Sequence, residues 1–122
     1  MSFQTEKKLV LDFYEALETS ELKGTLNVFS KYCSEDLFWR GFHPFNEING
    51  RETVCELFWN PLRSSLSSLT RRKDIFFAGK NTILGNEGIW VASMGHLMGL
   101  FDKPWLNISP TNKMIFLRYA EF

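Results

Sequence analysis

The sequence predicts an α+β domain in which helices come first and an antiparallel sheet follows. Apolar residues recur at helical spacing in the first part of the chain, whereas residues 72–122 carry three long strand-like segments. The chain shows no alternation of strands and helices and no glycine-rich phosphate loop, which are typical of parallel α/β folds. Its 122 residues are enough to bury one core without disulfides or metals, so we expect a single domain over residues 1–122.

Two amphipathic helices open the chain and should pair as a hairpin. The first spans Glu6 to Ser20, and its apolar face is formed by Val10, Phe13, Tyr14 and Leu17. The second begins after Thr19 and Ser20, and its apolar face is formed by Leu22, Leu26, Phe29 and Cys33.

A short strand and a third helix are predicted next. The aromatic-rich segment from Asp36 to Phe42 reads as a strand that is buried on both sides. Asn49 and Glu52 resemble a capping box for a helix that starts at about Arg51. Pro61 lacks a backbone N–H, so the helix should kink or restart there and run into the serine-rich stretch over residues 64–68, which reads as a turn or a frayed helix end.

The remainder reads as three strands, Arg72 to Lys80, Gly88 to Phe101 and Lys113 to Phe122. Both faces of the middle strand are largely apolar, so we expect both to be covered. Gly95 and Gly99 would let this strand bend strongly.

Composition argues against several classes of partner. Fourteen basic residues balance fourteen acidic ones, which leaves no net field for nucleic acid or an anionic membrane surface. We expect a cytoplasmic protein, because the start of the chain has no apolar secretory segment and no apolar run reaches the length of a membrane span. Cys33 and Cys55 read as buried thiols rather than metal ligands.

Several motifs are distinctive: W-R-G-F-H-P-F-N-E at 39–47, Gly50, F-W-N-P-L-R at 58–63, residues 90–99, and P-W-L-x-I-x-P-T at 104–111. Together they resemble the SnoaL-like polyketide cyclases of the nuclear transport factor two-like superfamily. The resemblance spans residues 9–122. It implies a cone-shaped fold, in which N-terminal helices cover a curved antiparallel sheet around a cavity. It also implies, for some members, an aldol-type ring closure by an acid/base carboxylate without metal or organic cofactor.

One departure from the family pattern concerns the end of the chain. Glu121 and Phe122 lie in the strand after which the family continues into a hairpin and another strand, so the fold is expected to be shortened at its C-terminus. The family's acid/base aspartate is expected on that further part, and no residue here matches it. A sheet without its last strand leaves an open edge, which predicts a homo-oligomer, a dimer or higher.

The candidate acid/base residues are two histidines and one carboxylate. His96 stands among apolar residues of the middle strand and His43 follows the first strand, and either could move a proton near neutral pH. A hydrogen-bonded structural role is the alternative for each. Outside the helices the carboxylates are Asp36, Glu47, Asp102 and Glu121. Glu47 is preferred because it belongs to the family-like segment, although a solvated loop carboxylate would look the same.

The candidate ligand-binding residues are mostly large and apolar. They are Trp39, Phe45, Trp59, Trp90, Met94, Met98, Trp105 and, in the last strand, Arg118. Ordinary core packing is the alternative for the aromatic residues, and structural ion pairing is the alternative for Arg118. No metal cluster or nucleophilic triad emerges from the sequence.

The leading hypothesis is a protein that binds a small, largely apolar molecule, polycyclic or carbonyl-bearing, in a cone-shaped pocket. The first rival is a cofactor-free cyclase, lyase or isomerase in which His96 or His43 works with Glu47. The second rival is a self-assembling or protein-interaction module without a functional cavity.

Overall fold

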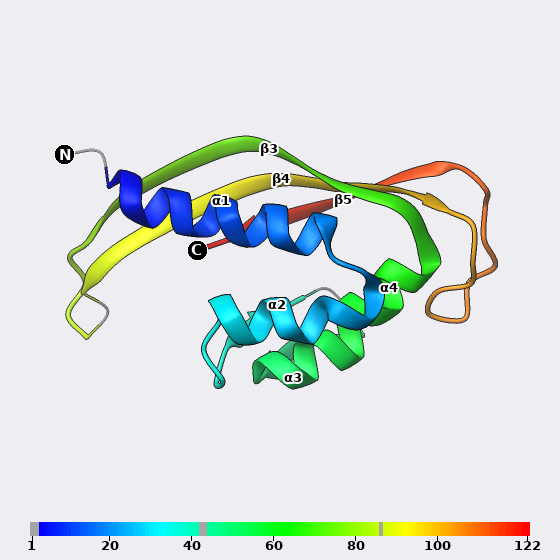
Figure 1. Cartoon of the computed structure of the whole chain (residues 1–122), viewed down its shortest axis with the longest axis horizontal. Coiled ribbons are helices and arrows are strands. Elements are labelled where there is room, and N and C mark those ends of the chain that lie inside the picture. The colour runs from blue at the N-terminus through cyan, green and yellow to red at the C-terminus, as the bar shows by residue number, and fades with distance from the viewer. Residues whose placement is uncertain (1–2, 42–43, 86) are drawn as a thin grey trace.

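Helices occupy one side of a curved antiparallel sheet in the computed structural model, which describes residues 3–41, 44–85 and 87–122 (Figure 1). The helical elements are α1 (Gln4–Thr19), η1 (Leu22–Gly24), α2 (Thr25–Tyr32), α3 (Arg51–Val54), η2 (Cys55–Trp59) and α4 (Asn60–Ser65). The strands are β1 (Phe38–Arg40), β2 (Glu47–Asn49), β3 (Leu66–Asn81), β4 (Gly88–Phe101) and β5 (Met114–Glu121). No helix in these ranges is long and apolar enough to cross a lipid bilayer.

The predicted apolar face of the first helix is confirmed, whereas that of the second is partly wrong. Tyr14 and Leu17 of α1 are buried. In the second helix Phe29 is buried as expected, but Leu22 and Leu26 are exposed. The helix begins only at Thr25, after the 3-10 turn η1, and this later start rotates Thr25 rather than the leucines into the interior.

The third helical region runs without a break from Arg51 to Ser65 but changes its winding. α3 passes into the π-helical segment η2, and Pro61, which has no N–H to donate, follows directly after this change of winding. The predicted irregularity at Pro61 is therefore absorbed inside one helical stretch. The predicted capping box is wrong, because Gly50 is the N-cap residue and no side chain caps the helix.

The first strand is half of a small hairpin that the sequence did not reveal. β1 pairs with β2 in an antiparallel register that aligns Trp39 with Ile48. The prediction that this strand is buried on both sides is wrong, since 59% of Phe38 is exposed. Only the face that carries Trp39 is turned toward the rest of the molecule, where its ring packs on Phe58.

The main sheet has the order β3-β4-β5, with both pairs antiparallel. Ser64 and Ser65 end α4, and β3 begins at Leu66, so residues 66–68, predicted as a turn or a frayed helix end, belong to the strand instead. The register between β3 and β4 shifts between Lys73 and Ile75. A Cβ on Gly95 would collide there with the carbonyl oxygen of Arg72, so a glycine is required at this close approach.

The two faces of the sheet differ, which corrects the prediction that the middle strand is covered on both sides. We call the face under the helices the inner face and the opposite one the outer face (Figure 1). Ser93, Gly95, Leu97 and Gly99 are buried on the inner face. On the outer face, Trp90 is exposed and Met94, His96 and Met98 are only half-buried. The sheet therefore buries one surface and presents the other to solvent.

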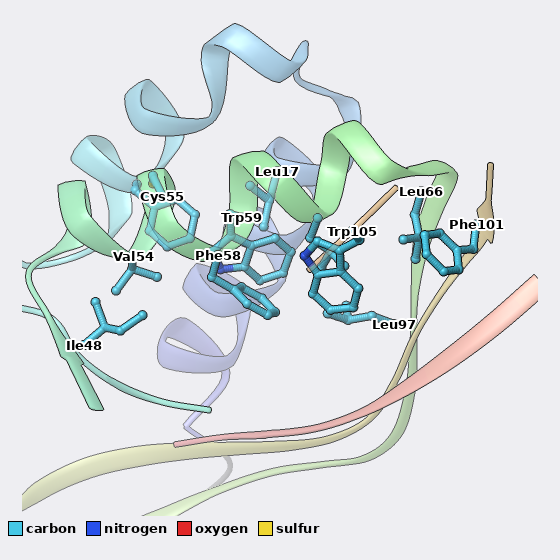
Figure 2. Close-up of a cluster of buried hydrophobic side chains, with 12 residues drawn as sticks. Leu17, Ile48, Val54, Cys55, Phe58, Trp59, Leu66, Leu97, Phe101 and Trp105 are labelled. Carbon is cyan, nitrogen blue, oxygen red and sulfur yellow. The ribbon is translucent and has the colours of Figure 1, made fainter. Parts of the chain in front are cut away.

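The buried core joins the helices to one end of the sheet (Figure 2). Phe58 and Trp59 of η2 lie at its centre, next to Trp105 from the loop after β4. Leu97 and Phe101 of β4 extend this core along the inner face. The rest of the inner face, towards the end of β5, carries polar side chains instead.

Candidate ligand site

Among the described residues, two cavities border the inner face of the sheet, and the larger also reaches residues assigned to the outer face, among them His96 and Arg118. The larger, about 700 Å³, lies between β1, η2, β4 and β5. The smaller, about 410 Å³, lies between α1, α4 and β3. Trp59, Arg71 and Leu97 line both cavities, so these three side chains stand where the cavities meet. Both volumes are within the range of small-molecule sites, about 300–1,000 Å³.

An ion pair with a tyrosine bridges three elements at this junction. Arg71 Nη1 of β3 donates to Glu121 Oε1 of β5 at 2.5 Å. The hydroxyl of Tyr14, from α1, donates to the same oxygen at 2.6 Å. The Arg71 side chain is only 5% exposed, whereas that of Glu121 is 34% exposed. The arginine is thus the deeper partner, and the carboxylate lies nearer to the opening.

Aromatic rings surround the guanidinium. Its central carbon lies 3.7 Å from the ring centroid of Tyr14 and 4.4 Å from that of Tyr119. The Tyr119 hydroxyl is 2.9 Å from the hydroxyl of Ser93, which also faces inward. Cation–π contacts of this kind stabilise a desolvated charge. They hold Arg71 through its faces and leave its edges for hydrogen bonds.

The environment fixes the charge states of two members of this cluster. Burial disfavours the charged form of Arg71, but the attraction of Glu121 outweighs it and keeps the pKa of Arg71 above its usual value. Burial raises the pKa of Tyr14, and the negative charge of Glu121 raises it further. Tyr14 is therefore a neutral donor, and Arg71 a permanent cation, at physiological pH.

Arg63 is the other arginine of the smaller cavity, and its donors are already used. Nη1 donates to the hydroxyls of Ser20 at 2.9 Å and Thr25 at 2.7 Å, and Nη2 donates to the backbone carbonyl of Ser20. These bonds tie α4 to the turn between α1 and α2. Arg63 therefore has a structural role.

His96 lies on the outer face rather than inside the cone. Although it belongs to the wall of the larger cavity, its Nδ1 is 3.1 Å from Asp74 Oδ2 and 3.0 Å from Arg72 Nη2. Its ring meets the exposed ring of Phe116 edge-on. The hydrogen bond from Arg72 lowers the pKa of Asp74, and His96 adds to this effect. His43 lies outside the described residues.

Glu47 does not approach the polar cluster of the inner face. It lies on β2, exposed, and its Oε1 accepts a hydrogen bond from Arg40 at 2.5 Å. The structure therefore does not bring Glu47 and His96 together.

The predicted ligand-binding residues divide into three groups. Trp39 and Trp59 line the larger cavity. Phe45 and Trp105 stack in the core, with ring centroids 6.2 Å apart. Strand alternation places the others on the outer face, although two of them, Met94 and Arg118, also border the larger cavity. These outer-face residues are Trp90, Met94, Met98 and Arg118.

Sequence reasoning missed the residues that form the polar cluster. Arg71 stands in the run R-R-K-D at 71–74, which has the composition of a solvated segment. Glu121 is one of the four carboxylates outside the predicted helices, among which the sequence favours Glu47. Tyr14 lies on the predicted apolar face of α1, and a hydroxyl on such a face is the signal that points to it. In the described ranges, no three or more His, Cys, Asp or Glu residues are grouped so as to hold a metal ion.

Comparison with solved structures identifies the fold. A crystal structure from Jannaschia sp. CCS1, named as a SnoaL-like polyketide cyclase, superposes with a TM-score of 0.65 at 19% sequence identity. The match covers 91% of this chain and 69% of that one. No protein-family model matches the sequence, and no curated protein matches it. The resemblance seen in the motifs is thus confirmed at the level of the fold.

Proposed function

Since the chain has the α+β cone fold of the SnoaL-like polyketide cyclases, we propose that it binds a small, largely apolar molecule in the larger cavity. The observation that carries this proposal is the cavity itself, about 700 Å³ with Trp39, Phe58 and Trp59 in its wall and the Arg71–Glu121 pair beside them. Apolar walls with a few convergent polar groups are the usual form of a small-molecule site. A polycyclic or carbonyl-bearing guest fits this chemistry.

A cavity-filling variant tests the proposal. The probe is N-phenyl-1-naphthylamine, an uncharged bicyclic amine that fluoresces in apolar surroundings. Leu117, on the inner face of β5, lines the larger cavity, so Leu117→Trp should occupy it and weaken probe binding by about tenfold or more. The matched control is Phe116→Trp, which changes the neighbouring residue on the outer face. Equal weakening by both variants, or no binding to the unchanged protein, would contradict the proposal.

A second candidate function is cofactor-free acid/base catalysis on a carbonyl compound, which the position of Glu121 favours. The carboxylate is partly exposed next to the cavity, and Tyr14 and Arg71 both donate to its Oε1. Glu121 would take a proton from the carbon next to a ligand carbonyl. The C–H electron pair would move towards the carbonyl oxygen to form an enolate, and the proton would return to a carbon of the ligand. Isomerisation or ring closure can follow from such an enolate.

Exchange of α-protons tests this candidate without knowledge of the natural substrate. The probe is 2-tetralone in D2O, followed by proton NMR. The protein should accelerate loss of the α-proton signals, and Glu121→Gln should abolish the acceleration. Glu47→Gln and His96→Ala should leave it intact, because neither side chain belongs to the polar cluster. If exchange is lost in Glu47→Gln and His96→Ala but retained in Glu121→Gln, the acid/base residues are Glu47 and His96, as the sequence predicts, and not Glu121.

A further inference from the structure

We infer that the ligand of the larger cavity carries an oxyanion, a carboxylate or a sulfonate, and that Arg71 Nη2 donates to it. This inference rests on the proposed binding function and adds the chemical class of the guest. It starts from one unused group. Nη2 of Arg71 is buried and has no hydrogen-bond partner among the described residues.

An unpaired N–H on a buried guanidinium is costly. Leaving a buried donor unsatisfied costs about 1–3 kcal/mol, and more for a charged group. Arg63, the neighbouring arginine, shows the usual outcome, with both of its terminal nitrogens bonded to chain oxygens. Glu121 accepts from Arg71 Nη1 and the Tyr119 hydroxyl also stabilises the cation, but Nη2 meets no acceptor within hydrogen-bond distance among the described residues. This side of the fork is therefore left for a further partner.

Geometry favours an oxyanion that approaches along an edge of the guanidinium. The rings of Tyr14 and Tyr119 occupy the space near the guanidinium carbon, so a further partner must approach along an edge. Carboxylates bind the edge of an arginine, where paired N–H groups match two oxygens. The rings also keep water from the charge, which strengthens such a contact.

The apolar wall constrains the rest of the guest. Trp39, Phe58 and Trp59 line the larger cavity together with Arg71. An aromatic or polycyclic acid would place its rings against these side chains and its oxyanion at Nη2.

Two probes with the same aromatic skeleton test the inference. 8-Anilinonaphthalene-1-sulfonate carries an oxyanion, and N-phenyl-1-naphthylamine is the same molecule without it. The quantity measured is the ratio of their dissociation constants. In the double variant Arg71→Met/Glu121→Gln, which removes the ion pair without leaving a lone charge, the ratio should shift against the sulfonate by about tenfold. Glu121→Gln alone removes the negative charge that competes for Arg71 and should shift the ratio towards the sulfonate.

The matched control is Arg72→Met, which removes the adjacent arginine from the outer face. It should leave the ratio unchanged, and a shift as large as that of the double variant would mean that the sulfonate binds the outer face. If the uncharged probe binds but the ratio does not change in the Arg71 and Glu121 variants, the inference of an oxyanion is wrong and the proposed apolar site is still supported. If the uncharged probe does not bind at all, the proposed function itself fails. If the double variant does not fold, the shift of the ratio in Glu121→Gln tests the inference of an oxyanion by itself.

Discussion

The guanidinium of Arg71 and the carboxylate of Glu121 meet across strand β4, with Nη1 and Oε1 2.5 Å apart. Arg40 and Glu47 form a pair of the same length on the surface hairpin. The two pairs differ in solvent exposure, because the Arg71 side chain is 5% exposed and that of Arg40 is 71% exposed. Because the two pairs have the same N–O distance, comparing their coupling energies isolates the effect of burial.

Arg71→Leu should lower the free energy of unfolding by about 2–4 kcal/mol, because it leaves Glu121 without its cation in a partly buried position. A double-mutant cycle with Glu121→Leu, measured by urea denaturation, should give a coupling of about 1–3 kcal/mol. The matching cycle on Arg40 and Glu47 should give less than about 1 kcal/mol. Equal couplings would show that the inner pair is as solvated as the outer one.

Tyr14→Phe should change how stability depends on alkaline pH. The folded-state pKa of Tyr14 is raised above its usual value of 10.0, so the folded protein holds this proton more tightly than the unfolded chain does. Its contribution is complete below pH 10 and is lost as the pH rises beyond that value. The wild-type stability should therefore fall more steeply above pH 10 than that of Tyr14→Phe.

Urea denaturation at a series of alkaline pH values measures this difference, and the contribution of the thiols cancels in the comparison. Tyr32→Phe is the control, since the ring of Tyr32 packs on Phe13. If Tyr14→Phe and wild type lose stability in parallel, the Tyr14 hydroxyl is not held as the structure places it.

Gly95→Ala should destabilise the protein by about 1–3 kcal/mol, because the added methyl group meets the carbonyl oxygen of Arg72 where the strands approach most closely. Gly79→Ala in β3 is the control, since its Cβ would meet nothing within 4 Å. That change should stay within about 0.5 kcal/mol. Thermal denaturation of both variants compares them, and a tolerated Gly95→Ala would argue against the observed register.

The two thiols should react slowly in the folded protein. Burial raises the pKa of Cys33 to about 11 and that of Cys55 to about 11. At pH 8 roughly one thiol in a thousand is then ionised, and only the thiolate attacks Ellman's reagent. Both should react rapidly in urea, and Cys33→Ser isolates the signal of Cys55. A fast native reaction would place the cysteines closer to solvent.

We propose that the outer face pairs with a second copy of the chain. It exposes Ile75, Phe77 and Phe116 and also carries both signs of charge, since Asp74 and Arg118 lie among them. A face of this kind can complement itself about a two-fold axis. Sedimentation at micromolar concentration should show a dimer, and Phe116→Glu should dissociate it.

Leu84→Glu, in the exposed loop between β3 and β4, is the control and should leave the dimer intact. A monomeric wild-type protein would rule out self-association, and with it this role for the outer face.

The order of elements could be predicted from the sequence because it depends on local periodicity. The face of α1 that holds Tyr14 and Leu17 follows from helical spacing, and the three long strands follow from their apolar runs. The β1–β2 hairpin could not be predicted in the same way. Each strand has only three residues, and Trp39 is held by its contact with Phe58, which lies in another element.

The polar cluster escaped prediction for a related reason. Periodicity assigns a residue to a face but does not say which distant residue it meets there. Arg71 and Arg72 have the same charge and adjacent positions, yet one pairs inside with Glu121 and the other outside with Asp74. Strand alternation alone puts these two side chains on opposite faces. The register of this strand with β4 shifts directly after them, between Lys73 and Ile75.

The bond between Tyr14 and Glu121 joins residues 107 positions apart, and the ion pair of Arg71 closes a separation of 50. Closing such long loops costs chain entropy that neighbouring contacts must first offset. The hairpin of β3 and β4, which connects over a short loop, can form early, whereas these contacts need both ends of the chain in place. We therefore expect the cluster to be completed last during folding, so that a binding-competent molecule is also a fully folded one.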